Sequence, residues 1–173
     1  MLGRTYEAEV CSAARTLELV GERWSLLILR DALYRGTTRF ADFQRDLSVA
    51  TNILAKRLDG FVAAGLMEQR RYSERPELNT VAAPSGRRQR SRRYSERPEL
   101  YEYLLTTKGR ELQPVIIALT AWGDRWAAPN GPPILYEHAG CGGEIQAHLR
   151  CTTCGEVGTS APVVARRGPG MPG

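Results

Sequence analysis

The stretch SVATNILAKRLDGFVAAGLMEQRRY, residues 48–72, decides the fold. A short turn at 48–51 leads into an expected helix that runs to about Ala64, where Gly65 supplies a helix stop. One face of this helix is apolar at helical spacing, with Leu54, Leu58, Phe61 and Val62. The opposite face carries Thr51, Asn52, Ala55, Lys56 and Asp59. Residues 66–72 then predict a β-strand, so a helix with one polar face leads directly into a sheet.

Further helices are expected on both sides of this stretch. Helical periodicity covers residues 12–20, 22–34, 40–47 and 108–126. Residues 101–106 predict a second strand that pairs with 66–72, and Pro114 predicts a kink or a local break in the last helix. Three or four helices, a two-stranded hairpin and a closing helix are the element order of a winged helix. The expected fold is therefore mainly α, a winged helix-turn-helix with an α+β hairpin.

Length and composition limit the class of protein. The chain has 173 residues, 42% apolar and 25% charged, which suits one folded domain with a small appendage and excludes disorder of the whole chain. No stretch approaches the roughly eighteen apolar residues of a membrane span, so we expect a cytoplasmic protein with no membrane partner and no secretory signal. The expected parts are a domain at 8–126, a linker at 127–135, a cysteine-bearing segment at 136–158 and a flexible tail at 159–173.

The net charge of +5 is concentrated in one segment. Eight arginines and two glutamates lie between Arg70 and Arg93, a local charge of +6 that leaves about −1 for the rest of the chain. The sequence RRYSERPEL occurs at 70–78 and again at 92–100, which indicates a tandem duplication that lengthened one loop; either copy could supply the strand that pairs with 101–106. The charge favours a polyanionic partner, and the alternative is a solvated basic loop.

Helix 51–64 is the second helix of the expected helix-turn-helix, the one that enters the major groove. Thr51, Asn52 and Lys56 occupy its first turns, where Asn can pair with adenine and Lys with guanine acceptors, and Arg57 could reach phosphates. The alternative is an ordinary exposed amphipathic surface. We expect residues 79–91 to form an extended basic wing loop. Wing arginines can enter a minor groove or follow phosphates, and the candidates are Arg87, Arg88, Arg90, Arg92 and Arg93.

An ordered set of short motifs resembles the HxlR-type winged-helix regulators, which are MarR-like transcription factors. The set comprises Cys11, RTL at 15–17, VGERWSLLILR at 20–30, Arg39-Phe40, ATNIL at 50–54, Arg57-Leu58, Gly65-Leu66, YSERP at 94–98, YEY at 101–103, Leu105-Thr106, Gly109 and Trp122-Gly123. The resemblance implies a transcriptional regulator that binds a palindromic double-stranded DNA operator as a homodimer, with Arg39 among the DNA-binding residues. It also implies a dimer interface formed by the first and last long helices, with Leu17, Leu112, Ile116, Leu119, Trp122 and Trp126. The wing extension of 22 residues departs from the family pattern.

Two signals could regulate such a protein by changing the spacing of the two recognition helices. Cys11 matches the position of a cysteine that some family members use to sense oxidants or electrophiles. A thiol senses only if it is exposed and its thiolate is favoured, for which Arg15 is a candidate, and the alternative is a small buried apolar side chain. The second candidate signal is a small aromatic ligand near Trp122 and Trp126.

The segment at 136–158 predicts a metal site. His138 and Cys141 form one pair with a two-residue gap, and Cys151 and Cys154 form another. Zinc takes four N/S ligands in a tetrahedron, and reduced thiols in a cytoplasmic protein favour metal over disulfides. We therefore expect one structural Zn²⁺ per chain in a zinc-ribbon-like appendage, with His148 as a competing fourth ligand. The alternative is a cysteine-rich segment without metal.

Features of an enzyme are lacking in the sequence. It contains no Gly-rich phosphate loop, and both histidines lie in or beside the cysteine-bearing segment, so no histidine-based triad can be placed in the main domain. We therefore expect that the protein is not an enzyme. The rival hypothesis is a zinc-containing module that binds protein, or a non-specific nucleic-acid-binding protein that uses the arginine-rich loop.

Overall fold

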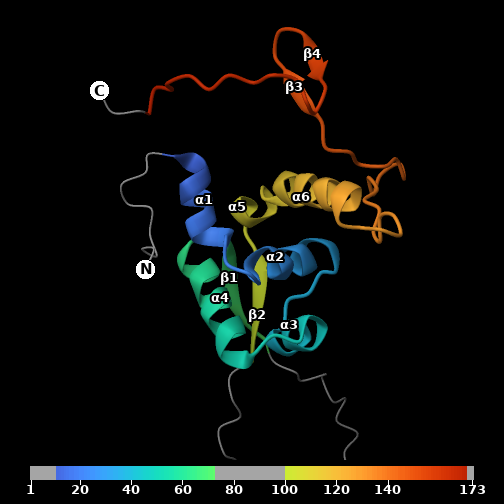
Figure 1. The fold of residues 1–173 in the computed structure, drawn as a ribbon. Helices are drawn as coiled ribbons and strands as arrows, with labels where there is room; N and C mark the ends of the chain where they lie inside the picture. Colours follow the sequence, from blue (N-terminus) through green and yellow to red (C-terminus); the bar gives the residue numbers. More distant parts are fainter. Residues whose placement is uncertain (1–10, 73–99, 171–173) are drawn as a thin grey trace, which may run out of the picture.

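A computed structural model describes residues 11–72 and 100–170 as a winged helix-turn-helix followed by an extended C-terminal segment (Figure 1). The elements are α1 (Ser12–Val20), α2 (Ser25–Tyr34), α3 (Phe40–Leu47), α4 (Thr51–Ala63), β1 (Met67–Tyr72), β2 (Leu100–Leu105), α5 (Thr107–Arg110), α6 (Gln113–Trp126), β3 (Leu149–Cys151) and β4 (Gly155–Val157). The β1–β2 hairpin lies between α4 on one side and α2 and α3 on the other, and α6 packs against α2. The predicted fold class of the main domain is confirmed.

One apolar core joins the helices to the hairpin. Its buried side chains are Val20, Ile28, Leu29, Phe43, Val49, Leu54, Leu58, Phe61, Leu66, Met67, Tyr103 and Ile116. The apolar face expected for α4 is therefore the buried one, with Val62 partly buried against the same core. Burial of this face fixes the rotation of α4 about its axis and turns its polar face outward.

The turn between α3 and α4 is tight. Ser48, at the end of α3, has a left-handed backbone with φ 50°, which brings Val49 back into the core at 3% exposure. Ala50 is extended and begins α4, because its carbonyl oxygen accepts hydrogen bonds from the N–H groups of Ile53 and Leu54 at 3.0 Å each. These contacts set the angle between the two helices of the helix-turn-helix.

The register of the β1–β2 hairpin shows which copy of the repeat forms the strand that pairs with β2. β1 and β2 are antiparallel, with Met67 opposite Leu105, Arg70 opposite Glu102 and Tyr72 opposite Leu100. Since β1 contains residues 70–72, the first copy supplies this strand, and the second copy contributes its last residue to β2. Within β2, the Tyr103 N–H donates to the Thr38 carbonyl oxygen at 2.8 Å, which ties the segment just before α3 to the sheet.

The helix expected at 108–126 is divided, because Pro114 lies in the first turn of α6, where a backbone N–H is not needed. The preceding short helix α5 is capped by Thr106, whose hydroxyl accepts a hydrogen bond from the Gly109 N–H at 3.2 Å. An added methyl group at Gly109 would overlap the Leu66 carbonyl oxygen, so only glycine fits there. The start of α2 also differs from the expected residue 22, since its first residue is Ser25.

Beyond α6 the chain is mostly irregular and exposed. Its only strands in the described residues are β3 and β4, a short antiparallel hairpin that stands away from the helical body in Figure 1. Among residues 11–72 and 100–170, no helix combines the length and the apolarity that crossing a bilayer requires.

Candidate nucleic-acid interface

The outward face of α4 presents polar side chains on a rigid element. Asn52, Lys56 and Asp59 are exposed, while Leu54 and Leu58 on the opposite side are fully buried. A carboxamide and an ammonium one helical turn apart can meet neighbouring base pairs in a major groove, because i and i+4 lie on the same face. Of the predicted base-reading residues, Asn52 and Lys56 thus share this face.

Thr51 also positions α4. The Gln44 side-chain amide donates a hydrogen bond to the Thr51 hydroxyl at 2.7 Å, so the first turn of α4 is tied to α3. Thr51 keeps its own O–H as a donor. Sequence reasoning missed Gln44, since nothing in its spacing marks it as a partner of Thr51.

Arg57 does not join Asn52 and Lys56 on the outward face. Its guanidinium forms an ion pair with Glu22 at 3.0 Å, and its side chain is only 18% exposed. The contact joins α4 to the segment before α2. The phosphate contact predicted for Arg57 would require this pair to open.

The hairpin brings two further arginines near the start of α3, toward the end of the strands that leads into the wing loop. The Arg39 guanidinium lies over the Tyr72 ring at 4.5 Å, and Arg70 donates to Glu102 at 2.7 Å. A stacked arginine keeps its N–H groups at the ring edge free to meet phosphate oxygens. The five wing candidates Arg87, Arg88, Arg90, Arg92 and Arg93 lie outside the described residues.

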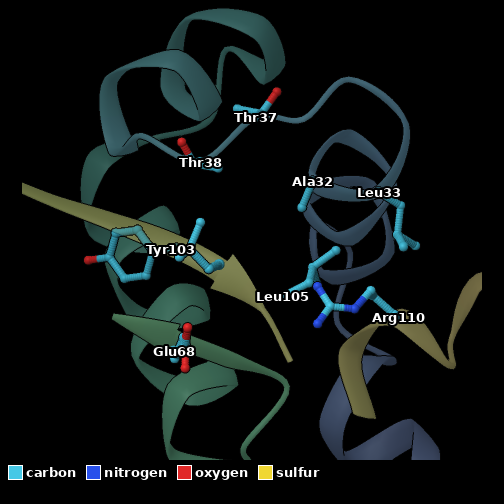
Figure 2. Close-up of a pocket in the computed structure, with 9 residues that line it drawn as sticks. Ala32, Leu33, Thr37, Thr38, Glu68, Tyr103, Leu105 and Arg110 are labelled. Atoms are coloured by element: carbon cyan, nitrogen blue, oxygen red, sulfur yellow. The ribbon is translucent and has the colours of Figure 1, made fainter. Parts of the chain in front are cut away.

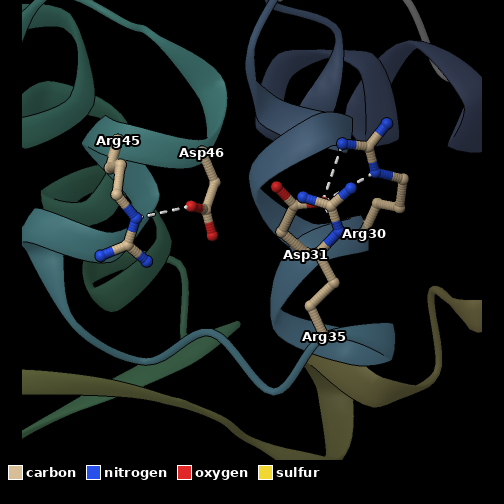
Figure 3. Close-up of polar contacts among 5 residues, drawn as sticks. All are labelled: Arg30, Asp31, Arg35, Arg45 and Asp46. Atoms are coloured by element: carbon tan, nitrogen blue, oxygen red, sulfur yellow. Dashed lines mark hydrogen bonds and ion pairs between the residues drawn. The ribbon is translucent and has the colours of Figure 1, made fainter.

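Charged contacts stabilise α3 on its exposed side. Arg45 donates to Asp46 at 3.0 Å (Figure 3) and to Asp42 at 2.7 Å. These hydrogen bonds raise the pKa of Arg45. Because the two carboxylates already surround Arg45, α3 offers no excess positive charge at this point.

A buried ionic cluster closes the end of α2, and sequence reasoning missed it. The fully buried Asp31 accepts from Arg30 Nε at 2.9 Å and Nη2 at 2.8 Å, with Arg35 Nε at 3.7 Å (Figure 3). The Asp31 carbonyl oxygen also accepts from the Thr37 N–H at 3.2 Å. The cluster therefore fixes the turn that leads into α3. The available signal was a charged pair directly after the apolar run at 26–29.

A hollow of about 380 Å³ lies between α2 and the hairpin (Figure 2). It is lined by Ala32, Leu33, Thr37, Thr38, Glu68, Tyr103, Leu104, Leu105 and Arg110. Burial raises the pKa of Tyr103, with the Asp59 charge a smaller cause, so its phenol stays neutral and accepts from the Gln69 amide at 3.4 Å. No residue of α4 lines this hollow, which separates it from the outward face of that helix.

The residues predicted for a dimer interface divide into two groups. Ile116 is 3% exposed and Leu112 packs against the same apolar core, so both residues stabilise the fold of the single chain. Leu119, Trp122 and Trp126 are 51%, 62% and 66% exposed, and Leu17 on α1 is exposed as well. We name the exposed row Val115, Leu119, Trp122 and Trp126 the α6 stripe. Its spacing of four, three and four residues keeps the row on one side of the helix.

Cys11 is exposed at the start of α1 in the single chain. Arg15 follows one turn later, but its guanidinium bonds both carboxylate oxygens of Glu18 at 2.9 Å. Sensing through Cys11 stays a prediction.

The four predicted zinc ligands lie as two pairs. His138 Nδ1 is 3.3 Å from Cys141 Sγ, and Cys151 and Cys154 flank the β3–β4 turn. Backbone N–H groups of Cys154 and Thr153 lower the pKa of Cys151 to about 7. Within the described ranges, no three or more histidine, cysteine or acidic side chains gather into one metal-binding group. The competing ligand His148 bonds the Gln146 side chain at 3.0 Å through Nε2.

Comparisons with known proteins agree with this geometry. The model of the HxlR-like helix-turn-helix family matches residues 19–90 and 87–131. An uncharacterized HTH-type transcriptional regulator of Mycobacterium tuberculosis, Rv3095, is 39% identical over 98% of this chain and 92% of its own length. The crystal structure of PA1607, described as a candidate transcription factor, has a TM-score of 0.67 at 31% identity and covers 94% of this chain and 99% of that one. PA1374 from Pseudomonas aeruginosa, similarly described, has a TM-score of 0.56 at 34% identity, over 92% and 93%.

Proposed function

Since this chain belongs to the HxlR-like helix-turn-helix family and is an HTH-type transcriptional regulator, we propose that it acts as a homodimer in the cytoplasm on a palindromic DNA operator. In this proposal α4 reads bases in the major groove and the hairpin contacts the flanking backbone or minor groove. The outward polar face of α4 is the observation that carries it.

Base recognition would come from Asn52 and Lys56. Both side chains are exposed on the first half of α4, while the buried face of the helix and the bond from Gln44 to Thr51 hold that helix in place. A rigid helix loses little conformational entropy when it docks, so each side-chain contact contributes more of its energy to discrimination. A bidentate pair of this kind contributes about 1–3 kcal/mol against the wrong base.

The hairpin would supply affinity that does not depend on sequence. Arg39 lies against Tyr72, the last residue of β1, and the five arginines of the extended wing follow in the chain. Each phosphate neutralised by such a side chain releases counterions and makes binding weaken with salt.

Dimerisation would come from the α6 stripe. Two exposed indoles and two exposed aliphatic side chains on one face are costly to leave in water, and a second copy of α6 can cover them. A two-fold arrangement would place two copies of α4 about one turn of DNA apart, as a palindromic site requires.

Selection of bound sequences from a random duplex pool tests this function. We expect two inverted half-sites with centres about 10 base pairs apart. Binding of the selected duplex should survive competitor DNA, and Asn52→Ala/Lys56→Ala should reduce it at least tenfold. Arg166→Ala removes the same charge from the exposed C-terminal tail and should leave binding unchanged.

Recovery of no preferred sequence would contradict this proposal. So would unchanged affinity in the double variant together with its loss on removal of the wing arginines. The latter result would favour non-specific binding through the arginine-rich loop.

A further inference from the structure

Two turns after α6 share one local design. The first runs from His138 to Gly143, where the N–H groups of Cys141 and Gly142 both donate to the His138 carbonyl oxygen, at 3.1 and 2.8 Å. The second joins β3 to β4 and runs from Cys151 to Gly155. Each turn has a candidate ligand, two intervening residues, a cysteine and then a glycine. These glycines, Gly142 and Gly155, have φ of +71° and +86°, which side chains rarely adopt.

The first turn already holds two ligand atoms at a useful distance. His138 Nδ1 and Cys141 Sγ are 3.3 Å apart. In a tetrahedral zinc site with Zn–N near 2.0 Å and Zn–S near 2.3 Å, the nitrogen and sulfur lie about 3.5 Å from each other. The pair therefore has the separation of two ligands of one metal ion. The antiparallel bridge between Glu137 and Glu144 closes the ends of this turn.

The second turn directs backbone donors at sulfur. The Thr153 N–H donates to Cys151 Sγ at 3.5 Å. A thiolate bound to zinc keeps negative charge that such N–H groups stabilise, an outer-shell interaction typical of metal sites. Cys154, at the far end of the same turn, is exposed and has a free thiol.

From these two turns we propose that His138, Cys141, Cys151 and Cys154 bind one Zn²⁺ per chain as a closed, structural site. The two pairs lie apart in the structure, so binding moves the β3–β4 hairpin onto the first turn. The connection allows this movement, because residues 146–148, between the Ile145 N–H that donates to the Tyr136 carbonyl oxygen and the start of β3, form no helix or strand.

The first turn is anchored to the helical body two residues before His138. The Tyr136 ring lies 4.5 Å from the Tyr34 ring of α2, and its hydroxyl is 3.4 Å from the Thr120 hydroxyl of α6. Burial, with Tyr136 a smaller cause, raises the pKa of Tyr34 to about 12. A metal at His138 would therefore tie the C-terminal segment to the helix that carries the α6 stripe.

Cobalt titration of the reduced full-length protein tests the site. Co²⁺ in a tetrahedral site with three thiolates and one imidazole gives strong visible d–d absorption and near-ultraviolet thiolate charge transfer. We expect saturation at one Co²⁺ per chain and displacement by one equivalent of Zn²⁺. His138→Ala and Cys151→Ser/Cys154→Ser should lose the tetrahedral thiolate spectrum.

Two matched controls define the ligand set. His148→Ala removes the other histidine, and Cys11→Ser removes the one thiol outside the segment; both should keep the full spectrum. Far-ultraviolet circular dichroism of every variant should be unchanged, since the site lies outside the helical domain.

Absence of a thiolate–cobalt spectrum in the fully reduced protein would overturn the proposal. Its survival in Cys151→Ser/Cys154→Ser would do the same, and loss in His148→Ala would reject His138 as the fourth ligand. None of these measurements uses DNA, so their outcome is independent of the proposed regulatory function.

Discussion

Replacing Trp122 with alanine should weaken the dimer strongly without unfolding the chain. The indole is 62% exposed at the middle of the α6 stripe. A tryptophan side chain presents about 200 Å², so about 120 Å² of it remains to be covered by a partner. At about 25 cal/mol per Å², covering that area is worth at most about 3 kcal/mol per protomer.

The two-fold symmetry of a homodimer doubles this effect, since each copy loses one indole. Only part of such a transfer energy appears as binding energy, because ordering and imperfect packing offset the rest. Taking half of the doubled value, the loss is about 3 kcal/mol, which corresponds to a rise in Kd of about a hundredfold.

Sedimentation equilibrium over a range of concentrations measures this Kd directly. Val164→Ala is the matched control, because Val164 is even more exposed at 88% but lies outside α6. The control should dimerise as the wild type does, and both variants should keep the wild-type Tm at high dilution. A change in Kd below threefold for Trp122→Ala, or a monomeric wild type, would refute the assignment of the α6 stripe to the dimer interface.

Three further predictions concern the wing and the stability of the domain. Deleting residues 71–92 removes one copy of the repeat and six arginines. The variant should fold, prefer the same operator and bind it with an affinity that depends less steeply on salt concentration. An unchanged salt dependence would show that these arginines never touch DNA. Asp31→Ala leaves the partly buried Arg30 guanidinium unpaired, so the free energy of unfolding measured in urea should fall by about 2–3 kcal/mol. A fall of under 1 kcal/mol would contradict a stabilising role of this ionic cluster. Gly109→Ala should lower the free energy of unfolding by about 1–3 kcal/mol, because the added methyl group overlaps the Leu66 carbonyl oxygen. Gly60→Ala is the control, since open space surrounds Gly60, and it should be neutral or stabilising. Equal stability of the two variants would argue against the close approach of Gly109 to Leu66.

The elements of the domain could be predicted because each leaves a local pattern. The apolar spacing of α4 matches the burial of Leu54, Leu58 and Phe61, and Pro114 marks the point where the last helix is divided. These signals depend on residues within a few positions of one another. Helix starts were less certain, as α2 shows, because local periodicity does not mark the first hydrogen-bonded turn.

The strand assignment within the repeat needed long-range information. Two identical copies have identical propensity, so sequence alone left either one able to pair. The choice depends on Met67, which is buried at the start of β1 opposite Leu105 and follows the end of α4 after three residues. With that register fixed, residues 70–72 of the first copy continue the strand.

Site residues could be predicted from the sequence only where helical periodicity shows that a side chain is exposed. The polar face of α4 follows from periodicity, but the ion pair between Arg57 and Glu22 joins residues far apart in sequence and could not be foreseen. In the same way, the periodicity of α6 found an apolar row without showing which part its own core covers. Ile116 is inside and Trp122 outside, and that division depends on where α2 packs.

The central claim is that α4 reads base edges, and coupling between one side chain and one base pair tests it most directly. Affinity would be measured for the selected operator and for each single base-pair change in a half-site, with the wild type and with Asn52→Ala. The account predicts that the wild type loses about 1–3 kcal/mol at one adenine-containing position and that Asn52→Ala no longer distinguishes bases there, while other positions keep their preferences. If Asn52→Ala keeps the wild-type preference at every position, α4 does not read the operator through Asn52 and the account is contradicted.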